Sequence, residues 1–373
     1  MLYPTAIYFL YLLISLSFYW SLRLIFPNKK FAFISLLIIN IIFLLIASPY
    51  IFLFIFLEFF LIVFLYKVIK NYGLDESLSW ITVSPLFLLS GPLLKNTIYS
   101  RFLEFFTNLT YENTPFLIGG TFIALKSFII LKYWLKQNKI NLIESLLSLT
   151  FIPSFPAGPI HGSRVWNEDL IHKNISRKKF ISLNIFLIAF CRIFWGISSL
   201  MIISSYIASF IPSYSPNNFS IFYGSYIRFI ALFFDFSGYS SIAIGSAMLF
   251  GVILPENFNK PFLATNIQEY WQRWHISMSG FIGTYIYKSY VRATNKRKLG
   301  IFISFVFAGL WHKISIPFLI WGIGHGSLMA FSPKFNFDFI NNKLLRKALG
   351  WFITFNIVSI LSALSTGYIR LSY

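Results

Sequence analysis

The sequence predicts an all-α polytopic membrane protein. Of its 373 residues 57% are hydrophobic and 12% charged, a ratio that no soluble globular domain has. The apolar residues come in long uncharged blocks, and residues 31–57 hold no Lys, Arg, Asp or Glu, which exceeds the ~20 residues that a spanning helix needs. The blocks are continuous, whereas strands of a membrane barrel alternate apolar and polar residues. Helices are therefore expected and a barrel is excluded.

Hydropathy predicts three helices at the N-terminus, over residues 3–25, 31–46 and 50–66. The first charged residue is Arg23, so the basic stretch of a cleaved signal peptide is missing and the first helix is expected to be retained. Lys and Arg crowd the short cytoplasmic loops of membrane proteins. This bias places Lys67 and Lys70 inside and the N-terminus outside.

The same bias assigns further basic loops to the cytoplasm. They cover residues 132–139, 164–179, 288–298 and 334–347. The uncharged loop 211–220 is expected outside. Because topology accounts for the net charge of +19, a nucleic-acid partner is not expected. Without repeats or low-complexity linkers, we expect one transmembrane domain over residues 1–373, with N-terminal helices in 1–110 and a core at about 110–333.

Two stretches differ from ordinary spans. Residues 151–164 (FIPSFPAGPIHGSR) hold three prolines and two glycines, which break helical hydrogen bonding. Broken backbone at membrane depth must line a cavity or be buried in protein. Residues 299–333 are apolar but have basic loops on both flanks, so the segment should enter and return. As helix it rises only about 52 Å, too little for two full crossings of a ~30 Å core, so we expect a turn inside the membrane.

Three of the five histidines lie in the apolar C-terminal third: His275, His312 and His325. An ionisable residue within the membrane is a functional candidate. The alternative is that each hydrogen-bonds a neighbouring helix or lies at the headgroup boundary. His312 is the strongest candidate, because it would lie about 20 Å deep when counted from residue 299. The other two, His161 and His172, fall in a basic loop and are expected to be solvated.

A second polar group occurs in FFDFSGYSS, where Asp235, Ser237 and Tyr239 interrupt an apolar block. A buried carboxylate needs a partner. Arg228 and Arg273 are candidates, or Asp235 could orient a histidine. A purely structural clamp between helices is an equal alternative.

The sequence lacks the motifs of several known kinds of functional site. Cys191 is the only cysteine, which excludes an intrachain disulfide and a thiolate metal cluster, and we expect it to pack in the core. There is no G-x-S-x-G, H-E-x-x-H or P-loop motif. No histidine has an acid five positions later, as soluble glycerolipid acyltransferases do. No bound metal is expected.

The residues FDFSGYSS, EYWQRWHISMSG, GLWH and LIWGIGHG, in this order, resemble the membrane-bound O-acyltransferase family. PAGPIHGSR resembles the A-G-P-I segment of its bacterial branch, which acylates exported polymers and includes the alginate O-acetylation and teichoic-acid D-alanylation membrane proteins. The similarity covers residues 151–331, half of the chain. Gly283-Thr284-Tyr285 and Lys313 depart from the family, which often has Arg-Asp-Tyr and glycine there.

The resemblance implies a ring of helices with re-entrant segments around a funnel. It places the family's invariant histidine at His312 and a second, variable one at His275, both as catalytic residues. The remaining candidates would line the substrate chamber: Asp235, Ser237, Tyr239, Trp271, Arg273, Trp274, Trp311 and His325.

The implied reaction carries an acyl group, acetyl or D-alanyl, from a cytoplasmic thioester to a hydroxyl of a cell-envelope polymer. No covalently bound cofactor is expected. The donor would be acyl-coenzyme A or an acidic carrier protein with phosphopantetheine, and an extracytoplasmic transfer partner is a further expectation. The chain would be a multi-pass protein of the bacterial cytoplasmic membrane. The alternatives are a transporter or flippase with an Asp and His site at mid-membrane, or a glycosyltransferase with a lipid-linked donor.

Overall fold

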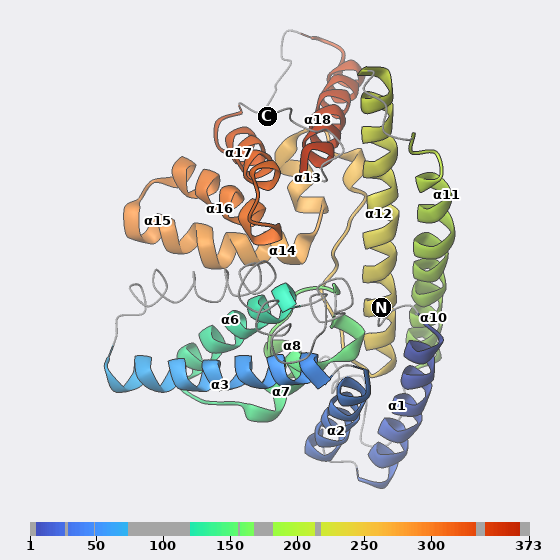
Figure 1. Cartoon of the computed structure of the whole chain (residues 1–373), viewed down its shortest axis with the longest axis vertical. Helices are drawn as coiled ribbons and strands as arrows, with labels where there is room; N and C mark the ends of the chain where they lie inside the picture. Colours follow the sequence, from blue (N-terminus) through green and yellow to red (C-terminus); the bar gives the residue numbers. More distant parts are fainter. Residues whose placement is uncertain are drawn as a thin grey trace, which may run out of the picture. The chain divides into compact units, whose positions relative to one another are not determined.

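The computed structural model describes residues 5–26, 29–47, 49–73, 120–155, 157–167, 182–212, 218–332 and 340–365. Within these ranges every element is helical, and β pairing is limited to one bridge between Phe258 and Trp274 (Figure 1). Six of the described helices are long and apolar enough to cross a membrane: Ala6–Ile25, Lys30–Ala47, Ile51–Asn71, Leu183–Ala208, Phe222–Leu249 and Lys343–Ser365. The prediction of an all-α polytopic membrane protein is confirmed.

The chain divides into two compact units. The first comprises Met1–Ile197 and Tyr239–Pro255, and the second comprises Ser198–Gly238 and Glu256–Tyr373. The division does not test the predicted single domain with its core at 110–333. The helical ring and its funnel also stay predictions.

The first three helices agree with the sequence-based prediction. They are α1 (Ala6–Ile25), α2 (Lys29–Ala47) and α3 (Pro49–Asn71). The Thr5 side chain caps α1 by accepting from the Tyr8 N–H at 3.3 Å. Tyr11 donates to Asn40 of α2 at 2.6 Å, and the Tyr8 hydroxyl donates to Ser246 at 2.8 Å. Such polar contacts join apolar helices, which gain little from burial when lipid is the solvent.

The proline-rich segment follows two helices of the first unit, α6 (Gly120–Gln137) and α7 (Leu142–Thr150). As predicted, it is irregular, with only a 3₁₀ turn, η3 (Ile152–Ser154), and the short α8 (Arg164–Asn167). A Cβ at Gly158 would lie 2.6 Å from the Ser154 Cα. Glycine therefore allows this segment to fold tightly back on itself.

A continuous helical stretch follows in the sequence, made of α10 (Leu183–Ile197), the π-helical η4 (Ser198–Ser204) and α11 (Ser205–Ala208). Cys191 is exposed on α10, so the expectation that it packs in the core is wrong. In the second unit, η4 lies along α12 (Asn218–Leu249) (Figure 1). Ser199 and Ser204 donate to the carbonyls of Phe234 and Ala231, at 2.8 and 3.0 Å.

Short helices fill the sequence between α12 and the C-terminal helices. They are η5 (Pro261–Leu263), α13 (Ile267–Arg273), α14 (Ile276–Phe281), the π-helical η6 (Ile282–Tyr287) and α15 (Lys288–Thr294). The basic stretch 288–298 was expected to be a loop, but it is mostly helical. Charged residues on an exposed helix face form helix as readily as loop.

The apolar stretch 299–333 forms a helical hairpin, as expected of a segment that enters and returns. Its helices are α16 (Arg297–His312) and α17 (Ile316–Phe331), each about 24 Å long and so shorter than a ~30 Å hydrocarbon core. The hairpin packs through glycines, because a Cβ at Gly322 would lie 2.7 Å from the carbonyl oxygen of Phe305. The last helix, α18 (Lys343–Ser365), contacts η5, since Trp351 donates to the Phe262 carbonyl at 2.7 Å.

Candidate active site

His312 lies at the closed end of the hairpin, as the last residue of α16. Its ring contacts the rings of Trp311, Phe318 and Trp321, with centroids 4.7, 5.7 and 5.7 Å away. The side chain is not covered by the other described residues. The physical reason is its position: Lys313 leaves the helix in an extended conformation (φ −163°, ψ 134°), so no further helical turn covers the imidazole.

His275 connects α13 and α14 in a left-handed conformation, with φ 42°. Two backbone bonds hold the chain on either side of it: Asn259 N–H donates to Arg273 O, and Ile276 N–H donates to Asn257 O, both at 2.9 Å. The ring is 4% exposed and packs edge-on against Phe236 at 4.7 Å. Burial, and secondly the nearby His312, lowers the pKa of His275 to about 3. The two predicted catalytic histidines are therefore close enough to interact electrostatically.

A third histidine, His325 on α17, shares with His312 a contact to the Trp321 ring. The Trp271 indole N–H donates to its Nδ1 at 3.3 Å, so in the neutral ring the proton lies on Nε2. The Trp321 ring lies 4.6 Å from His325 and 5.7 Å from His312. Aromatic and imidazole rings thus connect α13 with the end of the hairpin.

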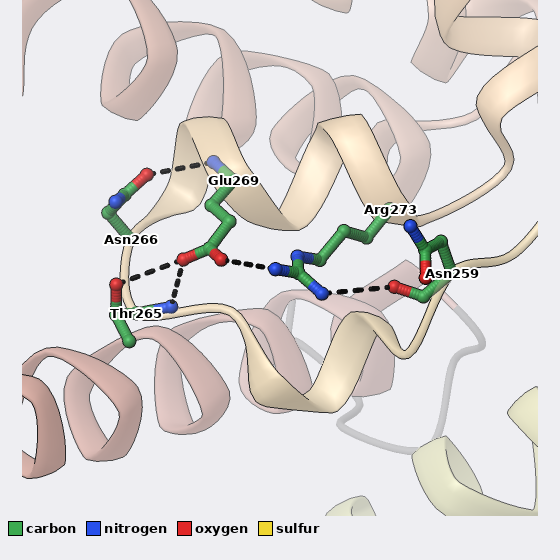
Figure 2. A network of polar contacts seen from close by, with 5 residues as sticks. All are labelled: Asn259, Thr265, Asn266, Glu269 and Arg273. Carbon is green, nitrogen blue, oxygen red and sulfur yellow. Dashed lines mark hydrogen bonds and ion pairs between the residues drawn. The ribbon is translucent and has the colours of Figure 1, made fainter.

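Arg273 belongs to a polar network at α13, which Figure 2 shows. Its guanidinium pairs with Glu269 at 2.7 Å and donates to the Asn259 carbonyl at 3.4 Å. Glu269 also accepts from the backbone N–H and the hydroxyl of Thr265, at 2.8 and 2.9 Å. Burial acts to raise the pKa of Glu269, but the bonds from Thr265 and Arg273 outweigh it and lower the pKa. The network fixes the start of α13 and holds Asn259 and Thr265, which precede the helix, against it.

The Arg273 pairing corrects the expectation that it could neutralise Asp235. Asp235 is exposed, and within the described residues no ion pair joins it to Arg273 or Arg228, so neither predicted pairing is found. It shares one face of α12 with the exposed Leu232, three residues earlier. Ser237 is half-buried in the same unit, whereas Tyr239 is half-buried in the first unit.

The two remaining tryptophans are buried. Trp311 is 2% exposed and Trp274 is 8% exposed. The Trp274 ring stacks on Tyr270 at 5.6 Å and on Phe229 at 5.4 Å. It therefore belongs to an aromatic core beside His275.

In the first unit the structure shows a polar cluster that the sequence did not reveal. Lys126 donates to the Ser154 hydroxyl at 3.0 Å, and that hydroxyl lies 2.8 Å from Nε2 of His161. All three side chains are buried, so the expectation that His161 is solvated is wrong, while His172 lies outside the described residues. Burial, and secondly Lys126, lowers the pKa of His161. A lysine within an apolar stretch was the available signal.

Comparison with known proteins adds the family. The model of the membrane-bound O-acyltransferase family matches residues 52–363. A peptidoglycan O-acetyltransferase of Helicobacter pylori is 30% identical, over 67% of this chain and 46% of the relative. A teichoic acid D-alanyltransferase of Bacillus subtilis is 29% identical, over 54% of this chain and 55% of the relative. A probable alginate O-acetylase of Pseudomonas aeruginosa is 29% identical, over 59% and 42%. The chain spans about half the length of the curated relatives it matches.

Proposed function

Because the chain belongs to the membrane-bound O-acyltransferase family, we propose that it transfers an acyl group, acetyl or D-alanyl, from a thioester to a hydroxyl of a cell-envelope polymer. The observation that carries the proposal is the contact of the Trp321 ring with the rings of both His312 and Trp271, which joins the closed end of the hairpin to α13, the helix before His275. All of these residues lie within the matched range. The names of the relatives, which acetylate or D-alanylate such polymers, support it.

In the proposed mechanism His312 is the general base. Its imidazole accepts the proton of the acceptor hydroxyl while that oxygen attacks the thioester carbonyl, and the proton then passes to the leaving sulfur. The products are an oxygen ester and a free thiol. Such positioned proton transfer contributes about 10²- to 10⁴-fold in rate. Donors for the oxyanion would come from the Trp311 or Trp274 indole, from His275, or from backbone N–H groups at the end of the hairpin.

The chain is a multi-pass membrane protein, and we place it in the cytoplasmic membrane of a bacterium, as for its bacterial relatives. The donor would approach from the basic, cytoplasmic side as acyl-coenzyme A or on an acidic carrier protein. Arg292, Lys296 and Lys298 are exposed there and suit either phosphate or an acidic surface. An extracytoplasmic protein could carry the acyl group onward to the polymer.

Replacement of His312 by alanine tests the proposed function. We expect ester formation on the acceptor polymer to fall by about 10²-fold or more, with expression and membrane insertion unchanged, as measured by mass spectrometry of the purified polymer. Ile323→Ala is the control, because Ile323 is 42% exposed on the same hairpin and takes no part in the chemistry. Normal acylation by His312→Ala would refute the assignment.

The transporter alternative makes a different prediction. A transporter would move its substrate across vesicles without forming an acyl ester. The relatives named above are transferases, and no feature of the described residues favours transport.

A further inference from the structure

Lys313 is the only Lys, Arg, Asp or Glu in residues 299–332. These 34 residues include nearly all of the hairpin, and all of them are described by the structure. A charged side chain in such a segment is unfavourable by several kcal/mol unless water or an opposite charge reaches it. The rule that basic residues mark cytoplasmic loops does not explain a lysine at this position.

The hairpin presents Lys313 next to the proposed catalytic base. Its side chain is exposed, as is that of His312. Its backbone N–H still bonds the Gly309 carbonyl at 3.3 Å, but its extended conformation takes the side chain off the helix. Among the described residues no carboxylate lies within ion-pair distance of it, whereas Arg273 is paired with Glu269. The positive charge at the closed end is thus uncompensated by the described part of the chain.

The two ends of the hairpin differ in charge. Lys296, Arg297 and Lys298 precede or begin α16, and the chain after α17 continues to the basic start of α18. Basic flanks lie in the cytoplasm. The closed end, about 24 Å further along α16, then points toward the opposite side, from which an exported acceptor would approach.

We propose that Lys313 binds an anionic group, phosphate or carboxylate, that the acceptor carries close to the hydroxyl that is acylated. This inference rests on the proposed function and specifies its acceptor class. A lysine ammonium is a compact point charge that suits either anion. Because Lys313 lies beside His312, an anion bound to Lys313 would hold the neighbouring hydroxyl of the acceptor next to the His312 imidazole. Lys313 therefore favours an anionic polymer over a neutral glycan.

The test uses the full chain in phosphatidylcholine nanodiscs with acetyl and D-alanyl thioesters. Oligo(glycerol phosphate) is the anionic acceptor, and oligoglycerol of equal length is its neutral counterpart. We expect Lys313→Met to raise the KM for the anionic acceptor about tenfold with little change in kcat. The neutral acceptor should respond equally to both proteins. Lys313→Arg should retain most of the preference. Lys343→Met, an exposed lysine at the start of α18, should behave like wild type.

Binding of oligo(glycerol phosphate) is measured separately, by calorimetry without donor. We expect Lys313→Met to weaken it by about tenfold too. Unchanged binding, or equal losses with both acceptors, would overturn the role of Lys313. Absence of ester with every acceptor despite Lys313-dependent binding would instead count against the proposed function.

A lipid headgroup is another source of phosphate for the same ammonium. The assays are therefore repeated in nanodiscs with phosphatidylglycerol. If the effect of Lys313→Met appears only with this lipid, the anion is the headgroup and the acceptor inference is wrong. An equal effect in both lipids supports the acceptor.

Discussion

His275 combines a left-handed backbone conformation with a buried side chain. Its φ of 42° lies in the left-handed region, which residues other than Gly, Asn and Asp seldom adopt. Backbone bonds from Asn259 and Ile276 enforce this turn. Buried with a pKa of about 3, the ring is neutral at physiological pH.

His275→Asn separates the backbone from the imidazole. Asparagine tolerates the left-handed conformation, and it is neutral at every pH, as His275 is above about pH 3. We expect the variant to fold and the shape of its pH–rate profile between about pH 5 and 8 to match that of wild type. A profile shifted by this substitution would mean that His275 titrates in the working range.

His275→Val provides the contrast. A β-branched residue is strained in the left-handed region by about 1–2 kcal/mol, so this variant should lose stability that His275→Asn keeps. Equal thermal midpoints for both variants would show that the turn is not enforced.

At the scale of elements, the hairpin depends on glycine. A Cβ at Gly309 would meet the Phe318 carbonyl of the facing helix, and one at Gly326 would lie 2.9 Å from the Phe302 carbonyl. Small residues allow helix backbones to approach closely where lipid removes the hydrophobic drive for association. This close approach keeps His312 and Trp321 in contact.

Gly309→Ala should therefore destabilise the protein by about 1–3 kcal/mol, since the helices must move apart. The measurement is the thermal midpoint of the detergent-solubilised protein, together with acylation activity. Gly280→Ala is the matched control, because Gly280 is also helical but its Cβ would meet nothing within 4 Å. Alanine there should be neutral or slightly stabilising. Equal behaviour of the two variants would contradict close packing of the hairpin.

For the whole molecule, the orientation of the hairpin is the feature that connects the two sides of the membrane. Cysteine labelling tests it directly in a Cys191→Ser background, because Cys191 is the only cysteine. Lys298→Cys should react with an impermeant maleimide in inside-out vesicles, and Lys313→Cys should react in intact cells. Labelling of both from the same side would exclude the proposed orientation.

Much of the fold follows from the sequence because the apolar run that marks a membrane helix extends over about 20 residues. The helices α1 to α3, the irregular proline-rich segment and the hairpin were all predictable from uncharged blocks, proline and flanking charge. Burial of single polar residues was not. Asp235 is exposed and His161 is buried. Burial of one side chain depends on which other segment packs against it, and the hydropathy of its own segment does not reveal that.

The sequence by itself determined the membrane class, the first three helices, the hairpin and the histidines that could carry chemistry, because these depend on composition and order alone. Only the tertiary structure decided that Arg273 pairs with Glu269, that His325 accepts from Trp271, and that His312 and Lys313 are exposed together. These relations depend on contacts between distant segments and on where a helix ends, and a linear pattern fixes neither.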